Sequence, residues 1–159
     1  MAVPLRQKAS DEPERNRNTG VALRWHAHWN SGAISAAEAR AAVGSFLDRV
    51  RATGHIIVPP RVAQDAQLVV SELITNVIRH APGACGMGLE VWPDAGLVQI
   101  SVWDTSPRPP RPRPHDGRRV GGHGLEIVQA VSHALTVTDR AHGKQITAQL
   151  LLSPAPPAE

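Results

Sequence analysis

The spacing of apolar residues changes along this chain, and the order of the changes restricts the class of fold. Residues 20–30 alternate between apolar and polar, which predicts a strand. Residues 35–53 and 61–80 instead carry apolar residues every three or four positions, which predicts two helices. Alternation returns at 86–92 and 97–103, and the short turn sequence between them predicts a hairpin.

The remainder of the chain adds one helix and two strands. A glycine-rich stretch, Gly121–Gly124, precedes a helical segment that extends to Ser132. Residues 134–139 and 144–152 are then predicted as strands. Helices gathered between runs of strands predict an α+β fold. We expect a two-layer α/β sandwich, with a mixed, mostly antiparallel sheet and helices on one face.

The ends of this pattern predict the domain organisation. The chain has 159 residues, enough for one domain of ordinary size. That domain is expected at 19–152, between a polar N-terminal arm at 1–18 and a tail rich in Pro and Ala at 153–159. Neither end has apolar periodicity, so we expect both to be flexible.

Basic charge is concentrated in one segment. The net charge of the chain is +3. Residues 105–120 hold five arginines and a single acidic residue, so they carry +4 and the rest of the chain carries −1. A basic segment is a feature of nucleic-acid-binding proteins. This one has no aromatic residue on which a base could stack, so we expect no direct contact with nucleic acid.

The compartment is predicted from what the sequence lacks. Cys85 is the only cysteine, so no internal disulfide can form, which is typical of a reducing compartment. No apolar run approaches the length of a transmembrane helix, and residues 1–18 lack the apolar segment of a signal peptide. We therefore expect a cytoplasmic protein without a membrane contact.

Three polar residues share one stripe of the helix predicted at 61–80. Glu72, Asn76 and His80 are spaced four residues apart, so they lie on one side of that helix. A carboxylate and a carboxamide one turn apart could hold a metal-bound phosphate beside an activated nucleophile, and Mg²⁺ prefers such oxygen ligands. The same spacing also describes the solvated side of an ordinary helix.

Two further positions could bind a ligand. Glycines before a helix let a phosphate approach the backbone N–H groups at its positive end, so Gly121–Gly124 could hold phosphate or could simply end a long loop. Asp104 follows an apolar strand, where it could accept a hydrogen bond from an exocyclic amine at the rim of a pocket. Alternatively, Asp104 is a surface residue that begins a turn.

Together these residues resemble a known family. The segment Ser71–Asn76, with His80 and Ala81, resembles the N-box of the Bergerat (GHKL) ATP-binding fold, which DNA gyrase, histidine kinases and heat-shock chaperones share. Val102–Asp104 is similar to the first glycine box of that fold, and Gly122–Leu125 to the second. The N-box and the short length are most similar to the bacterial anti-sigma-factor serine/threonine kinases. The resemblance covers about residues 20–152.

The resemblance implies a role for each matching residue. Glu72 would be the general base, Asn76 would coordinate the Mg²⁺ that bridges the phosphates of ATP, and Asp104 would bind the adenine amine. Thr147 would support the adenine through a water molecule. The remaining ATP contacts would come from Gly122, Gly124 and Leu125, and from Arg118 and Arg119 in an ATP lid at 105–121.

The resemblance also implies a function and its partners. The chain would be a serine/threonine protein kinase that uses Mg-ATP to phosphorylate an anti-anti-sigma (STAS-type) partner, and it would also sequester a sigma factor. A homodimer formed through the first strand is expected. Two departures from the family pattern are the prolines that follow Asp104 and the acidic Glu126 after the second glycine box. They favour an alternative, a non-catalytic ATP-binding module that regulates a partner by binding it.

Overall fold

The computed structural model describes residues 23–30, 34–80, 83–105 and 124–153. The predicted arm lies outside these residues, as does the lid except for Thr105 and the tail except for Ser153. The described residues form three helices, α1 (Ala36–Ala52), α2 (Pro60–His80) and α3 (Gly124–Val131). The same residues form five strands, β1 (Leu23–Trp29), β2 (Cys85–Trp92), β3 (Leu97–Asp104), β4 (Ala134–Arg140) and β5 (Gly143–Leu151).

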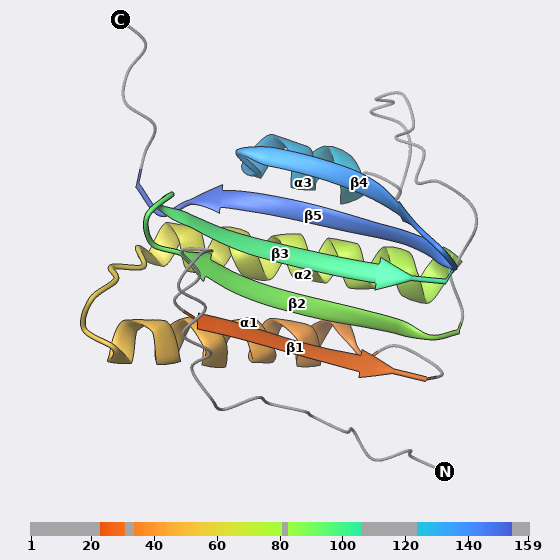
Figure 1. Cartoon of the computed structure of the whole chain (residues 1–159), viewed down its shortest axis with the longest axis horizontal. Coiled ribbons are helices and arrows are strands. Elements are labelled where there is room, and N and C mark those ends of the chain that lie inside the picture. The colour runs from red at the N-terminus through yellow and green to blue at the C-terminus, as the bar shows by residue number, and fades with distance from the viewer. Residues whose placement is uncertain (1–22, 31–33, 81–82, 106–123, 154–159) are drawn as a thin grey trace, which may run out of the picture.

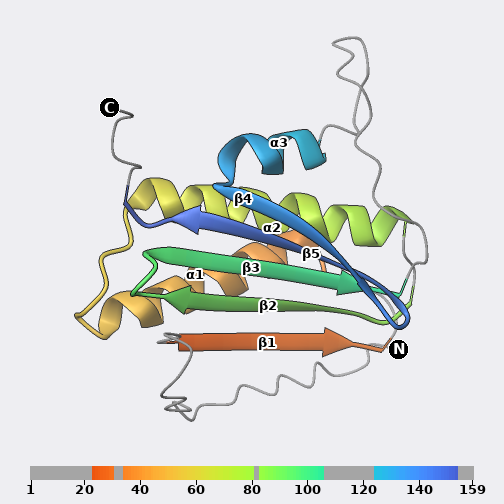
Figure 2. The same cartoon turned by 45° about the horizontal axis from the view of Figure 1, so that its top comes forward.

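The five strands form one sheet in the order β1-β2-β3-β5-β4, in which every pairing is antiparallel. The helices lie on one side of it (Figures 1 and 2). The predicted α+β sandwich is therefore confirmed. β5 lies between β3 and β4 in the sheet. β3 therefore pairs with a strand that follows it in the sequence only after α3 and β4.

Local sequence explains where α1 begins and ends. The Ser35 hydroxyl accepts a hydrogen bond from the backbone N–H of Glu38 at 3.1 Å, so it caps the first turn as the spacing of these residues predicts. After the last turn, Gly54 has a φ of 74°, a left-handed conformation that glycine adopts without strain. One face of α1 is buried, and it carries Ala39, Val43, Phe46, Leu47 and Val50.

Strand alternation gives the sheet a buried face and an open face. In β3, Val98, Ile100 and Val102 are buried against the helices, and the residues between them are half-buried on the other face. On the open face, the Trp103 ring lies over Gly86 of β2, where a Cβ would collide with it. The Arg140 guanidinium stacks 4.8 Å from the centre of the Trp103 ring.

The core lies between the sheet and the helices. The buried residues of α2 all contribute to it: Val62, Ala66, Val69, Val70, Leu73, Ile74 and Val77. α3 packs beside α2 on the same side of the sheet (Figure 2). Among the described residues, no helix is long and apolar enough to cross a lipid bilayer.

Candidate functional site

The polar stripe of α2 is only partly open to solvent. Glu72 and Asn76 are half-buried, and only His80, the last residue of the helix, is exposed. Their neighbours Leu73 and Val77 are buried in the core, which fixes the rotation of α2 about its axis. A simple solvated face therefore does not describe Glu72 and Asn76, and both are held at the boundary between the core and solvent.

The first residue of α3 lies directly against Glu72. Gly124 is buried, and a Cβ at this position would lie 2.6 Å from Glu72 Oε2. Any larger residue would require the end of the Glu72 side chain to move aside, so the glycine allows the carboxylate to take this position. The contact brings the N-terminal end of α3, which carries the partial positive charge of the helix dipole, to the polar stripe of α2.

Asp104 is the last residue of β3, and it points to the helix side of the sheet. Its side chain is only 7% exposed, so the alternative of a surface residue at a turn is wrong. Lys144 Nζ lies 2.9 Å from Asp104 Oδ2 and donates to Oδ1 at 3.2 Å, and the Lys144 side chain is 11% exposed. The two residues are direct cross-strand partners in β3 and β5. They form a buried ion pair at the edge of the core.

Gly143 sets the position of Lys144. It has a φ of 117°, and a Cβ there would collide with the backbone carbonyl of Asp104 and lie 2.6 Å from Thr105 Cα. The glycine therefore lets the start of β5 pass very close to the end of β3. This backbone contact holds Lys144 opposite Asp104.

Cys85 of β2 is the other cross-strand partner of Asp104. It is fully buried. Burial, and to a smaller extent the negative charge of Asp104, raise the pKa of the Cys85 thiol above its ordinary value. Cys85 is therefore held as a neutral thiol, and it packs as an apolar side chain.

Comparison with known families gives these positions a context. Residues 34–150 match the model of the histidine kinase-like ATPase domain, and this match covers more than half of the chain. The chain belongs to this family. A search of curated proteins finds no significant match.

The described residues suit the ligand of a histidine kinase-like ATPase domain, which is ATP. Asp104 offers a buried carboxylate as an acceptor, Asn76 offers an amide oxygen, and Gly124 leaves room at a helix N-terminus. Membership in the family supports ATP-dependent phosphoryl transfer or ATP hydrolysis as the class of activity. Leu125 and Glu126 are half-buried in the first turn of α3.

Thr147 is not brought together with Asp104. In β5 the residues Lys144, Ile146 and Ala148 face the helices, whereas Thr147 faces the open side of the sheet. There its hydroxyl lies 3.2 Å from the Ser101 hydroxyl. The resemblance places Thr147 beside the adenine, but the structure places it on the opposite face of the sheet from the Asp104 carboxylate.

Lys144 is the residue of this region that the sequence analysis missed. The signal for it was present, because Lys144 falls on the same face of its strand as Ile146, Ala148 and Leu150. A charged residue among apolar partners in such a pattern needs a buried counter-charge. Three other expected contacts lie outside the described residues: Arg118, Arg119 and Gly122.

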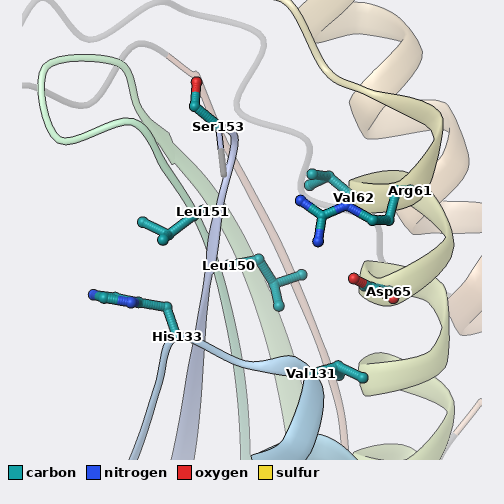
Figure 3. Close-up of a pocket in the computed structure, with 8 residues that line it drawn as sticks. All are labelled: Arg61, Val62, Asp65, Val131, His133, Leu150, Leu151 and Ser153. Carbon is teal, nitrogen blue, oxygen red and sulfur yellow. The ribbon is translucent and has the colours of Figure 1, made fainter. Parts of the chain in front are cut away.

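A cavity of about 230 Å³ lies elsewhere, at the opposite end of α2 from Asn76 and His80 (Figure 3). Its wall comes from the first turns of α2, the end of α3 and the end of β5, through Arg61, Val62, Asp65, Val131, His133, Leu150, Leu151 and Ser153. Glu72, Gly124 and Asp104 do not line it. The cavity is therefore separate from the candidate ATP site.

Proposed function

We propose that this chain is a serine/threonine protein kinase of the anti-sigma-factor type, with its ATP site between α2, α3 and the end of β3. The observation that carries the proposal is the contact between Gly124 and Glu72. It sets a carboxylate against a helix N-terminus, and Asn76 follows one turn later on the same side of α2. A proton acceptor, a site for phosphate and a ligand for Mg²⁺ thus lie side by side.

Each residue has a distinct task in this proposal. Asp104 accepts the adenine amine, and the N-terminal end of α3 holds phosphate. Asn76 ligates Mg²⁺, which would neutralise charge on the phosphates of bound ATP. Glu72 accepts the proton of the attacking serine or threonine hydroxyl, which makes the oxygen a better nucleophile. Phosphoryl transfer depends mainly on positioning and charge neutralisation, which suits a site with few groups.

The partners belong to the same proposal. The form of the N-box, Ser71–Asn76 with His80, supports an anti-anti-sigma protein of the STAS type as the substrate and a sigma factor as the protein that is sequestered. β1 is an edge strand of the sheet, with one side not paired to any described strand. A second copy could pair there, which supports a homodimer.

The alternative is an ATP-binding module that does not transfer phosphate. The observation that favours it is the ion pair between Asp104 and Lys144. Lys144 already contacts both oxygens of the Asp104 carboxylate, which is the group proposed to bind adenine. In this alternative the chain would act only by holding its partner. Titration calorimetry with Mg-ATP and an assay of phosphoryl transfer together separate the two functions.

The test replaces one carboxylate by its amide. Glu72→Gln should keep the affinity for Mg-ATP within about threefold and slow transfer of the γ-phosphate to a purified STAS-domain protein at least a hundredfold, as expected for loss of a general base. Asp65→Asn is the matched control, because Asp65 lies on α2 but lines the separate cavity. Normal transfer by Glu72→Gln would overturn the role of Glu72. Binding without transfer in the wild type would select the alternative.

A further inference from the structure

Burying the ion pair between Asp104 and Lys144 costs a small domain folding free energy. Both side chains are almost fully buried, and moving two charges out of water costs free energy that their attraction only partly returns. A pair of apolar side chains often stabilises such a position equally well. The pair therefore needs an explanation other than stability.

Lys144 has hydrogen-bonding capacity that the pair does not use. A lysine ammonium has three N–H groups. Within the described part of the chain, Nζ contacts the two carboxylate oxygens of Asp104 and no other acceptor. One N–H can thus serve another acceptor beside Asp104, and Gly143 holds the backbone so that Lys144 remains at this place.

We propose that Lys144 is a specificity-determining residue for the nucleotide base, donating to the ring nitrogen N1 of adenine while Asp104 accepts from the adjacent amine. This inference rests on the proposed binding of ATP at Asp104. Along the edge of adenine that pairs in nucleic acids, an amine donor lies next to the acceptor N1. The ion pair presents the complementary pattern, an acceptor next to a donor.

Lys144 is the β5 residue suited to this task. It faces the same side of the sheet as Asp104, whereas Thr147, the residue expected to support the base, faces the other side. An ammonium also gives a charge-assisted hydrogen bond, which is stronger than that of a neutral hydroxyl. The buried pair thus holds its acceptor and its donor in fixed positions before the base binds, so binding does not have to order them.

The test changes one atom of the ligand and one residue of the protein. The dissociation constants of Mg-ATP and of 1-deaza-ATP, in which C–H replaces N1, are measured by calorimetry for the wild type and for Lys144→Met. The wild type should bind 1-deaza-ATP about tenfold more weakly than ATP, the loss expected for one hydrogen bond to a charged group. Lys144→Met should bind the two ligands equally, and both about tenfold more weakly than the wild type binds ATP.

Controls are available for the ligand and for the protein. 7-deaza-ATP alters a nitrogen on another edge of the base, so replacing Lys144 should not change its affinity relative to ATP. Gln149→Met introduces the same side chain on the open face of β5, where Gln149 donates to Gln99, and should retain the preference for N1. If Lys144→Met does not fold, equal affinity of the wild type for ATP and 1-deaza-ATP would still overturn the role of Lys144.

Failure of this inference can be told apart from failure of the proposed function. Equal affinity of the wild type for ATP and 1-deaza-ATP overturns the role of Lys144 and leaves ATP binding intact. Tighter binding of ATP by Lys144→Met also overturns the role of Lys144, since Lys144 would then compete with adenine for the Asp104 carboxylate. If the wild type binds neither nucleotide, the proposed function fails and this inference fails with it.

Discussion

Gly124 and Glu72 approach so closely that a Cβ at position 124 would lie 2.6 Å from Glu72 Oε2 and would displace the end of the Glu72 side chain. The two residues belong to different helices, and α3 follows α2 only after the β2–β3 hairpin and residues 106–123. The contact couples the orientation of a carboxylate to the placement of a helix end. A substitution at either residue should therefore change the position of the other.

Gly124→Ala tests this coupling. The added methyl group has to displace the end of the flexible Glu72 side chain, so the free energy of unfolding should change by less than about 1 kcal/mol. Transfer of the γ-phosphate should slow at least tenfold, because the displaced carboxylate is the proposed general base. Urea denaturation and an assay of phosphoryl transfer measure the two effects.

The matched control is Gly44→Ala, also a helical glycine. Its new Cβ would lie 3.3 Å from the end of the flexible Gln67 side chain, which can move aside. We expect a change in stability between zero and a gain of about 1 kcal/mol, with phosphoryl transfer unchanged. If the two variants behave alike, the contact at Gly124 has no special effect.

Removing one member of the buried ion pair should strongly lower the free energy of unfolding. Asp104→Ala leaves the Lys144 ammonium buried without its partner, and the free energy of unfolding should fall by about 3–5 kcal/mol. The double variant Asp104→Ala/Lys144→Met should be more stable than Asp104→Ala, because no charge then remains in the core. Asp48→Ala serves as the comparison, since Asp48 pairs with Arg51 at the surface and should cost less than about 1 kcal/mol. A double variant less stable than Asp104→Ala would contradict this account.

The raised pKa of Cys85 predicts a small loss of folding stability at alkaline pH. Because burial and Asp104 raise the pKa of its thiol in the folded state, the unfolded chain loses this proton at lower pH than the folded one. The contribution to stability is complete below the pKa of the unfolded thiol and declines as the pH rises above it. The folded protein should also react slowly with a thiol reagent at pH 8, and urea should expose the group. Rapid labelling without urea would refute the burial of Cys85.

Thr147→Ala separates the family resemblance from the structure. The structure places Thr147 on the open face, so we expect ATP affinity to change less than twofold. Loss of its contact with Ser101 should lower stability by about 0.5–1.5 kcal/mol. A tenfold weaker affinity for ATP would instead support the role that the resemblance implies.

Local patterns were enough to predict the elements and part of the site. Glu72 and Asn76 share a face because helix geometry alone places residues four apart on one side. Asp104 could be singled out because it ends an apolar strand. The proximity of Glu72 to Gly124 could not be predicted, since it depends on how α3 packs against α2, and no pattern within either helix specifies that packing.

The faces of Thr147 and Lys144 show a different limit. The alternation of residues 144–152 predicts that Lys144 shares its face with Ile146 and that Thr147 does not. A resemblance compares residue types, whereas the face of a strand depends on even or odd position. The partner of Lys144 depends on the register of β3 with β5, which follows from the crossover in the sheet and not from the sequence of either strand.

The crossover also affects how this chain can change over evolutionary time. Pairing of β3 with β5 closes a loop that contains the arginine-rich segment, α3 and β4. The entropy lost on closing a loop grows only with the logarithm of its length, so doubling it costs about 0.6 kcal/mol. Insertions at 106–123 should therefore cost little folding free energy. New ligand or partner preferences can arise there without a matching change in the core.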